Sequence, residues 1–216
     1  MEDITILYYS ANNGDEKFEK EIVKNIIQNK GDLPVVSVTQ KSIDLGKNIC
    51  VGIHDVCYAN EFRQIQIGLK NIKTKYVLTA ESDFLYPPEY FNFRPDGKSD
   101  LYRYANVWVV FANRHNPRYH FKGVSDGAQL VDRKLWLEKI TEALGDEEVW
   151  YKKEDKPPLQ RFGTNYRYVW AGKPCITFKT IWNINQGTQL RSNSKPTRDI
   201  AYWGEINNLK KQMNLC

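Results

Sequence analysis

The segment that most constrains the fold of this chain is residues 75–91, where an apolar run leads into two carboxylates. Residues 76–79 are aromatic, β-branched or aliphatic, as in a short buried strand. Glu81 and Asp83 follow directly, and the period of two in an extended chain places both side chains on one side. The sequence therefore predicts two carboxylates that converge on one cation at the end of a strand.

Two prolines fix the exit from this strand. Pro87 and Pro88 end further pairing, because proline lacks the backbone N–H that a ladder requires. In open α/β sheets, ligands bind at the carboxyl ends of strands, where this acidic pair is expected. A segment such as Glu81-Ser82-Asp83 is also common as a helix N-cap or an Asx turn, so this alternative stays open.

The residues before this segment alternate between strand and helix patterns. Residues 4–9 and 34–38 are apolar runs that predict buried strands. Residues 16–28 have apolar side chains at helical spacing, and Asp15 is the expected N-cap. This is a βαβ unit, so the two strands should be parallel.

A loop and a helix complete the first half of the chain. Residues 40–55 have no clear period and are expected to form a loop, and residues 59–71 predict a helix. With the strand before Glu81, these elements predict a nucleotide-binding type of α/β unit. The Gly-rich dinucleotide fingerprint and the Walker motif are both missing from the sequence, which argues against dehydrogenases and ATPases.

The second half predicts shorter, aromatic-rich elements. Residues 146–158 are highly charged and end in two prolines, which favours a mobile lid or linker. The other expected elements are strands at 102–110, 119–121 and 175–181, an apolar segment at 128–131 and a helix at 133–144.

Composition bounds the class of protein. A chain of 216 residues predicts one domain over residues 1–216. The sequence has no run of about 18 apolar residues and no signal-peptide pattern, so we expect no membrane span and a cytoplasmic location. The four cysteines lack the spacing of a zinc site, which favours reduced thiols.

Charge is divided unevenly along the chain. Residues 1–96 hold 11 Lys and Arg against 14 Asp and Glu, whereas residues 97–216 hold 20 against 12. A basic half indicates a polyanionic partner, either nucleic acid or the phosphates of a nucleotide, or else a solvated face. A nucleic-acid-binding protein without chemistry is a weaker alternative, because the sequence has no helix-turn-helix, zinc-finger or RNA-binding signature.

Several short motifs occur in a fixed order over most of the chain. They are Phe62-Arg63-Gln64-Ile65, Gly68-Leu69, Tyr76-Val77, the segment from Glu81 to Pro88, Phe91, Tyr104-Ala105-Asn106-Val107-Trp108, the segment from Val124 to Arg133, the segment from Pro174 to Lys179, and Asn183. Together they resemble nucleotide-sugar glycosyltransferases of the GT-A fold, in particular a bacterial and phage group of short family 2-like enzymes. The resemblance implies a single α/β domain with a Rossmann-like mixed sheet flanked by helices. It also implies that residues 1–96 bind the nucleotide-sugar and residues 97–216 the acceptor.

This resemblance implies a UDP-sugar donor and a divalent metal, Mn²⁺ or Mg²⁺. Asp83 takes the place of the metal-binding acid of the family's Asp-x-Asp motif, with Glu81 as its companion. The residues expected to contact the donor are Tyr9, Ser10, Asn12, Arg63 (near the phosphates), Glu81 and Asp83.

The chain departs from the family pattern in two places. The first acid is Glu81 rather than Asp, with Ser82 at the middle position. Related sequences have Arg-His before the Asn, whereas this chain has Lys179-Thr180 and then Asn183. A histidine metal ligand is therefore missing. The metal would be held more weakly, or another group would complete its coordination.

Transfer of a sugar needs two further chemical functions. The charge that develops on the leaving diphosphate is stabilised by a hard cation held by carboxylates. The acceptor hydroxyl needs a general base, usually a carboxylate. Asp126 is the first candidate, with Glu148 and Asp155 of the charged loop as alternatives. Asp126 is equally typical of a turn or an N-cap, and Glu148 of a solvated charge.

The resemblance and the basic half together favour DNA as the acceptor. Phages use small GT-A enzymes to add sugars to hydroxymethylated pyrimidines, and a phage-encoded enzyme would act in the host cytoplasm. The alternatives are a cell-surface or lipid-linked saccharide acceptor, or a catalytically inactive domain that binds a nucleotide or glycan.

Overall fold

The computed structural model describes residues 3–155, 167–185, 187–188, 190 and 195–215. The helices are α1 (Glu16–Asn29), α2 (Tyr58–Asn71), α3 (Pro88–Phe91), α4 (Arg133–Leu144) and α5 (Ile206–Gln212). The strands are β1 (Ile4–Ser10), β2 (Val35–Thr39), β3 (Lys47–Cys50), β4 (Tyr76–Glu81), β5 (Phe84–Leu85), β6 (Leu101–Tyr104), β7 (Val107–Phe111), β8 (Tyr119–Gly123), β9 (Gln129–Asp132), β10 (Arg167–Trp170), β11 (Cys175–Lys179), β12 (Asp199–Ile200) and β13 (Gly204–Glu205).

The main sheet has seven strands in the order β10-β6-β9-β4-β1-β2-β3. Strands β4, β1, β2 and β3 are parallel, and β9 runs antiparallel to both β4 and β6. The expected parallel pairing of the first two strands is confirmed. Because β4 and β1 lie side by side, Glu81 is brought level with Tyr9 at the carboxyl edge.

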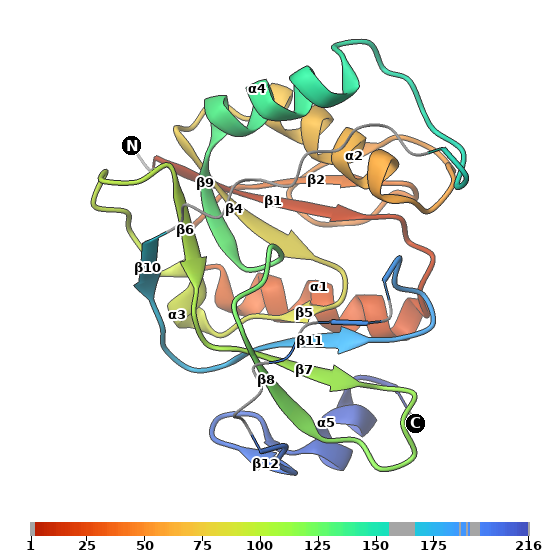
Figure 1. Ribbon diagram of the computed structural model, residues 1–216, viewed down its shortest axis with the longest axis vertical. Helices are drawn as coiled ribbons and strands as arrows, with labels where there is room; N and C mark the ends of the chain where they lie inside the picture. Colours follow the sequence, from red (N-terminus) through yellow and green to blue (C-terminus); the bar gives the residue numbers. More distant parts are fainter. Residues whose placement is uncertain (1–2, 156–166, 186, 189, 191–194, 216) are drawn as a thin grey trace.

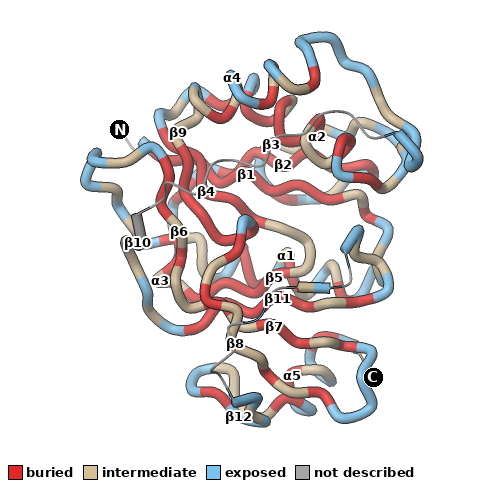
Figure 2. The backbone as a smooth tube through the Cα atoms, viewed as in Figure 1, coloured by how far each residue is buried: buried red, intermediate tan, exposed pale blue. Residues whose placement is uncertain are grey.

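Helices cover both faces of this sheet (Figure 1). Side chains of β1 alternate between two cores, as the period of two requires. Ile6 belongs to the core that includes Phe18 of α1, whereas Leu7 belongs to the core that includes Leu69 of α2 and Trp136 of α4. Figure 2 shows the central strands as the most continuously buried part of the chain. The expected fold class, α/β with a mixed sheet flanked by helices, is confirmed.

A second sheet, in the order β5-β11-β7-β8, packs below the main sheet in Figure 1. The prediction of one strand over residues 102–110 is wrong, because the chain breaks into β6 and β7, which belong to different sheets. Asn106 marks the break. Its amide donates to the Gly172 carbonyl at 2.7 Å and accepts from the Trp108 indole at 2.9 Å. The hydrophobic periodicity of a sequence cannot reveal that two consecutive strands belong to different sheets.

The loop predicted over residues 40–55 contains the edge strand β3, which pairs in parallel with β2. None of its four residues is buried, and Lys47 and Asn48 are polar, so it has no apolar signature. The expected N-cap of α1 is confirmed, since Asp15 accepts from the backbone N–H groups of Lys17 and Phe18. Among the described residues, no helix is long and apolar enough to cross a membrane.

The charged segment predicted as a lid is described as far as Asp155, and residues 156–158 lie outside the described part. Its backbone at Tyr151 exchanges two hydrogen bonds with the side chain of Asn60 on α2, both 2.8 Å long. The backbone N–H of Lys153 donates to Asp55 at 3.0 Å. The described part of this segment is therefore tied to the start of α2.

Candidate functional site

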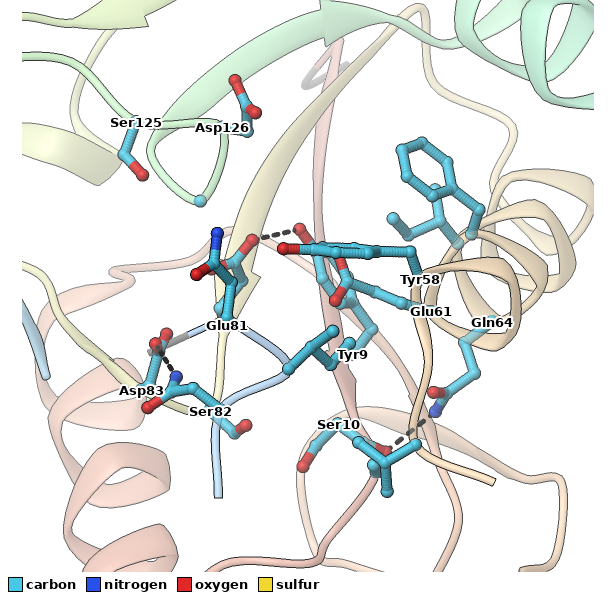
Figure 3. A pocket seen from close by; sticks show the side chains of 18 of the residues that line it. Tyr9, Ser10, Tyr58, Glu61, Gln64, Glu81, Ser82, Asp83, Ser125 and Asp126 are labelled. Carbon is cyan, nitrogen blue, oxygen red and sulfur yellow. Dashed lines mark hydrogen bonds between the residues drawn. The ribbon is translucent and has the colours of Figure 1, made fainter. Parts of the chain in front are cut away.

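A cleft of about 990 Å³ opens at the carboxyl ends of β1, β2 and β4 (Figure 3). One wall comes from α2, and the opposite wall comes from the second sheet and the segment 124–127. Glu81, Ser82 and Asp83 line the cleft where β4 ends. The carboxyl edge of the parallel strands is the position at which open α/β sheets bind ligands.

The two acids are held by different partners. Glu81 is the last residue of β4, and its Oε1 accepts a hydrogen bond from the Tyr9 hydroxyl at 2.7 Å. Asp83 lies in the turn before β5. Its Oδ2 accepts from the Asn183 amide at 2.6 Å and lies 3.9 Å from the Lys179 ammonium. Its backbone carbonyl accepts from the N–H of Phe178, so β11 fixes this turn.

Gly127 allows the opposite wall to approach Glu81. A Cβ atom at Gly127 would lie 2.4 Å from Glu81 Oε2 and 2.6 Å from the Phe84 ring, which is closer than real Cβ contacts. Tyr86 holds the two walls together: its hydroxyl donates to the Gly127 carbonyl at 2.6 Å and accepts from the Glu81 N–H at 3.0 Å. The segment 125–127 thus closes over the acidic strand end.

Three cations line the cleft among its described residues: Arg103, Lys122 and Lys179. Arg103 forms an ion pair with Asp126, with 2.6 Å between its Nη2 and the Asp126 Oδ1. Lys122 donates to the Ser125 hydroxyl at 2.6 Å. All three come from the second half of the chain, which carries the positive charge.

Glu61 is a cleft residue that the sequence did not reveal. It projects from α2 into the same space as Glu81 (Figure 3). Burial, followed by the charge of Glu81, raises the pKa of Glu61 to about 8. Burial, followed by the charge of Asp83, raises the pKa of Glu81 to about 7. The cleft therefore carries less negative charge at neutral pH than its carboxyl groups imply.

The acidic pair fits a divalent cation that is shared with a phosphate ligand. Among the described residues, the side-chain contacts of Asp83 fall on Oδ2, so Oδ1 has no side-chain partner there that would compete with a cation. The described part of the chain has no group of three or more His, Cys, Asp or Glu side chains able to hold a metal. Mg²⁺ is commonly held by one or two carboxylates together with substrate phosphates, and Asp83 and Glu81 match that mode.

Several predicted site residues meet in this cleft. Tyr9, Ser10, Glu81, Asp83 and Asp126 all line it. Asn12 does not, because its side chain fixes the turn after β1 by bonding to Glu19 and to the Lys41 N–H, each at 3.0 Å. 

Arg63, which was expected near the phosphates, does not line the cleft. Arg63 is 1% exposed and lies on the side of α2 that faces the segment after α4. Its guanidinium donates to the carbonyls of Leu144, Gly145 and Val149. Helical periodicity placed Arg63 beside the apolar face of α2 but could not show which neighbouring segment it contacts.

The charged-loop candidates for the base also lie away from the cleft. Glu148 is exposed and does not line the cleft. Asp155 lines a smaller neighbouring cavity of about 570 Å³, and its carboxylate accepts from the Lys152 N–H. Asp126 is the one candidate base of the three that reaches the cleft.

Gln40 is a second cleft residue that the sequence did not reveal. It follows β2 and is 3% exposed. Its Oε1 accepts from the His54 N–H at 3.1 Å, whereas its Nε2 is buried without a hydrogen-bond partner in the described structure. A buried donor of this kind costs free energy unless a ligand or water accepts from it. Gln40 thus offers a donor to a ligand in the cleft.

No protein-family model and no curated protein sequence matches the chain. Solved structures to which it is similar include the mannosyltransferase PcManGT from Pyrobaculum calidifontis in complex with GDP-Man and Mn²⁺, with a TM-score of 0.43 and 13% identity over 83% of this chain and 57% of that one. TarS 1-349 from S. aureus in complex with UDP-GlcNAc has a TM-score of 0.39 and 13% identity over 62% of this chain and 46% of its own. HddC from Yersinia pseudotuberculosis has a TM-score of 0.45 and 10% identity over 82% of this chain and 93% of its own. The chain thus spans about half the length of the first two, and its function has to be inferred from the cleft itself.

Proposed function

We propose that the protein is a glycosyltransferase that moves a sugar from a nucleotide-sugar, a UDP-sugar, to a hydroxyl acceptor. The observation that carries the proposal is the meeting of Glu81 and Asp83 with the end of β1 in one cleft. Its volume of about 990 Å³ is at the upper end for small-molecule sites. A nucleoside diphosphate linked to a sugar is a ligand of this size and charge.

The nucleoside end of the donor fits the part of the cleft near β1 and β2. Ser10, Asn13 and Gln40 line it there. Gln64 supports this edge from α2, since its amide donates to the carbonyls of Ser10 and Val38 at 2.8 and 2.9 Å. The unpartnered Nε2 of Gln40 suits a pyrimidine carbonyl oxygen, which is a hydrogen-bond acceptor.

Asp83 and Glu81 would hold the divalent cation, Mn²⁺ or Mg²⁺. When bound, the cation offsets the charge that develops on the leaving diphosphate. Asn183 keeps Asp83 in one orientation through its bond to Oδ2, and Tyr9 does the same for Glu81. The chain thereby orients both carboxylates before the donor arrives, which lowers the cost of reorganisation during the reaction.

Asp126 is our proposed general base. Its side chain is 66% exposed at the cleft, so an acceptor hydroxyl can approach it. Its carboxylate forms an ion pair with the Arg103 guanidinium at 2.6 Å. Arg103 itself is 13% exposed and so fixes the position of the base from below the surface.

We expect UDP to bind more tightly than ADP or CDP when Mn²⁺ is present. A cation held by Asp83 would offset the diphosphate charge of every member of this panel, whereas the Gln40 Nε2 donor suits O4 of uracil and not the amino group that cytosine and adenine carry at that position. Calorimetric titration of this nucleotide panel, with and without Mn²⁺, measures both effects. Failure of every nucleotide to bind below millimolar concentration would remove the main support for a nucleotide-sugar donor.

For the acceptor we favour a hydroxymethylated pyrimidine in phage DNA, on the basis of positive charge beside the cleft. Lys179 of the cleft is paired in register with Phe111 at the end of β7. The Arg114 guanidinium lies 4.0 Å from the centre of the Phe111 ring, and the Lys210 ammonium on α5 donates to the Ala112 carbonyl at 2.8 Å. A chain of cations that leads away from the cleft suits a polyanionic acceptor.

Incubation with UDP-sugars, Mn²⁺ and DNA that contains 5-hydroxymethylcytosine is therefore expected to add the mass of a sugar to the modified nucleoside. Plain cytosine DNA is the matched control, because it has no hydroxymethyl acceptor. Transfer should fall steeply with added salt, since phosphate contacts release counterions. Transfer to a saccharide acceptor without any mass gain on the modified DNA would contradict the DNA assignment and leave the donor proposal intact.

A further inference from the structure

Two lysines of the second sheet enter the cleft from neighbouring positions. Lys122 lies on β8, and Lys179 is the last residue of β11. These two strands flank β7 in the second sheet. Both side chains line the cleft that contains Glu81 and Asp83. The first half of the chain carries the acids, and the second half supplies these two cations.

The two ammonium groups are close enough to affect each other. Burial, together with the positive charge of Lys179, lowers the pKa of Lys122. Lys179 and Asp83 have side chains that are each 15% exposed, at a separation of 3.9 Å. Like charges held in a partly buried site are unfavourable unless an anion joins them. The carboxylate of Asp83 offsets one of these charges at a long distance.

Two arginines near the cleft, Arg103 and Arg63, are engaged elsewhere, whereas the described partner of Lys122 is the neutral Ser125 hydroxyl. Arg103, the remaining described cation of the cleft, forms its ion pair with Asp126 at 2.6 Å. Arg63 is bonded to carbonyls on the far side of α2. Lys122 and Lys179 are therefore the groups best placed for a ligand anion beside the acidic pair.

We propose that Lys122 and Lys179 bind the diphosphate of the donor, and that Lys179 exchanges Asp83 for the diphosphate when a divalent cation takes Asp83. The inference rests on the proposed nucleotide-sugar donor, because it assigns the contacts of that donor's diphosphate. Two ammonium groups and one divalent cation would offset the diphosphate charge. The lysines would then take the role that the sequence suggested for Arg63.

Calorimetric titration of UDP and uridine into the variants Lys122→Met and Lys179→Met, with Mn²⁺ present, tests this assignment. Each variant should bind UDP roughly tenfold to a hundredfold more weakly, since a charge-assisted contact is lost. Uridine has no phosphate, so its affinity should not change. Lys139→Met is the matched control, because Lys139 lies on α4, outside the cleft, in an exposed pair with Glu142.

Two further measurements separate the outcomes. Unchanged UDP affinity in both variants would overturn the inference, and so would equal losses of UDP and uridine affinity with a lower Tm, which indicate a structural role. Inorganic pyrophosphate serves as a probe that contains no nucleoside. If the parent protein binds pyrophosphate through the lysines but binds no nucleotide, the diphosphate site stands and the proposed donor fails. If it binds neither, the inference is overturned.

Discussion

Asp83→Asn is expected to reduce sugar transfer by roughly a hundredfold or more while the fold stays intact. The substitution removes one charge and keeps the shape of the side chain. Its amide oxygen can still accept from Asn183, which now bonds Oδ2 at 2.6 Å. The loss acts on the transition state, because the cation and the diphosphate charge meet there. Single-turnover transfer with a saturating donor measures it.

Asp146→Asn is the control for this experiment. Asp146 is an exposed carboxylate that pairs with Lys70 at 2.7 Å, outside the cleft. Exposed pairs of this kind contribute little to stability, so transfer and Tm should match the parent protein. An Asp83→Asn enzyme with full activity and an unchanged requirement for Mn²⁺ would show that the metal is held elsewhere.

Arg63→Met is expected to destabilise the protein by about 3–5 kcal/mol, because several buried carbonyls lose their donor at a cost of about 1–3 kcal/mol each. Arg63 bridges α2 to the segment after α4 through the carbonyls of Leu144, Gly145 and Val149. Methionine fills a similar volume but leaves these carbonyls, and the Oε1 of Gln66, without their donor. For a chain of this length, Tm should fall by roughly 6–20 °C in thermal unfolding.

Lys70→Met is the matched control on the same helix. Lys70 also reaches the segment after α4, where its ammonium donates to the Asp146 carbonyl at 3.0 Å from an exposed position. We expect a change within about 0.5 kcal/mol for this surface substitution. Below its Tm, Arg63→Met should bind UDP as the parent protein does. A selective loss of UDP affinity with an unchanged Tm would return Arg63 to the donor site.

The first half of the fold was predictable because its signals are local. The alternation of strand and helix patterns up to residue 81 places β1, α1, β2, α2 and β4 within a few residues of their bounds. Asp15 caps α1 through bonds to residues two and three positions ahead, a contact set by sequence spacing alone. The polar edge strand β3 and the change of sheet after β6 depend on tertiary pairing, so periodicity could not reveal them.

The residues of the cleft also divide into those that the sequence could predict and those that it could not. Tyr9, Ser10, Glu81 and Asp83 stand at the ends of predictable strands, so the sheet brings them together. Glu61 belongs to a helix face, and its role follows from where α2 crosses the sheet edge. Lys122 and Lys179 are far from the acids along the chain, so the sequence does not show that they share a cleft with them. For the same reason, the sequence does not show that Arg63 lies outside this cleft. Local pattern identifies the residues at a strand end, but the opposing wall comes from long-range packing.

The turn that contains Asp83 is completed by residues made much later in synthesis. Asn183, which fixes its carboxylate, lies 100 residues further along the chain, and the N–H of Phe178 in β11 holds its backbone. A nascent chain that has folded the βαβ unit therefore still lacks the wall that orients its acid. Because closing such a distant contact comes late in folding, an incomplete chain has no competent site. The wall that orients Asp83 is complete only once Phe178 and Asn183 have left the ribosome.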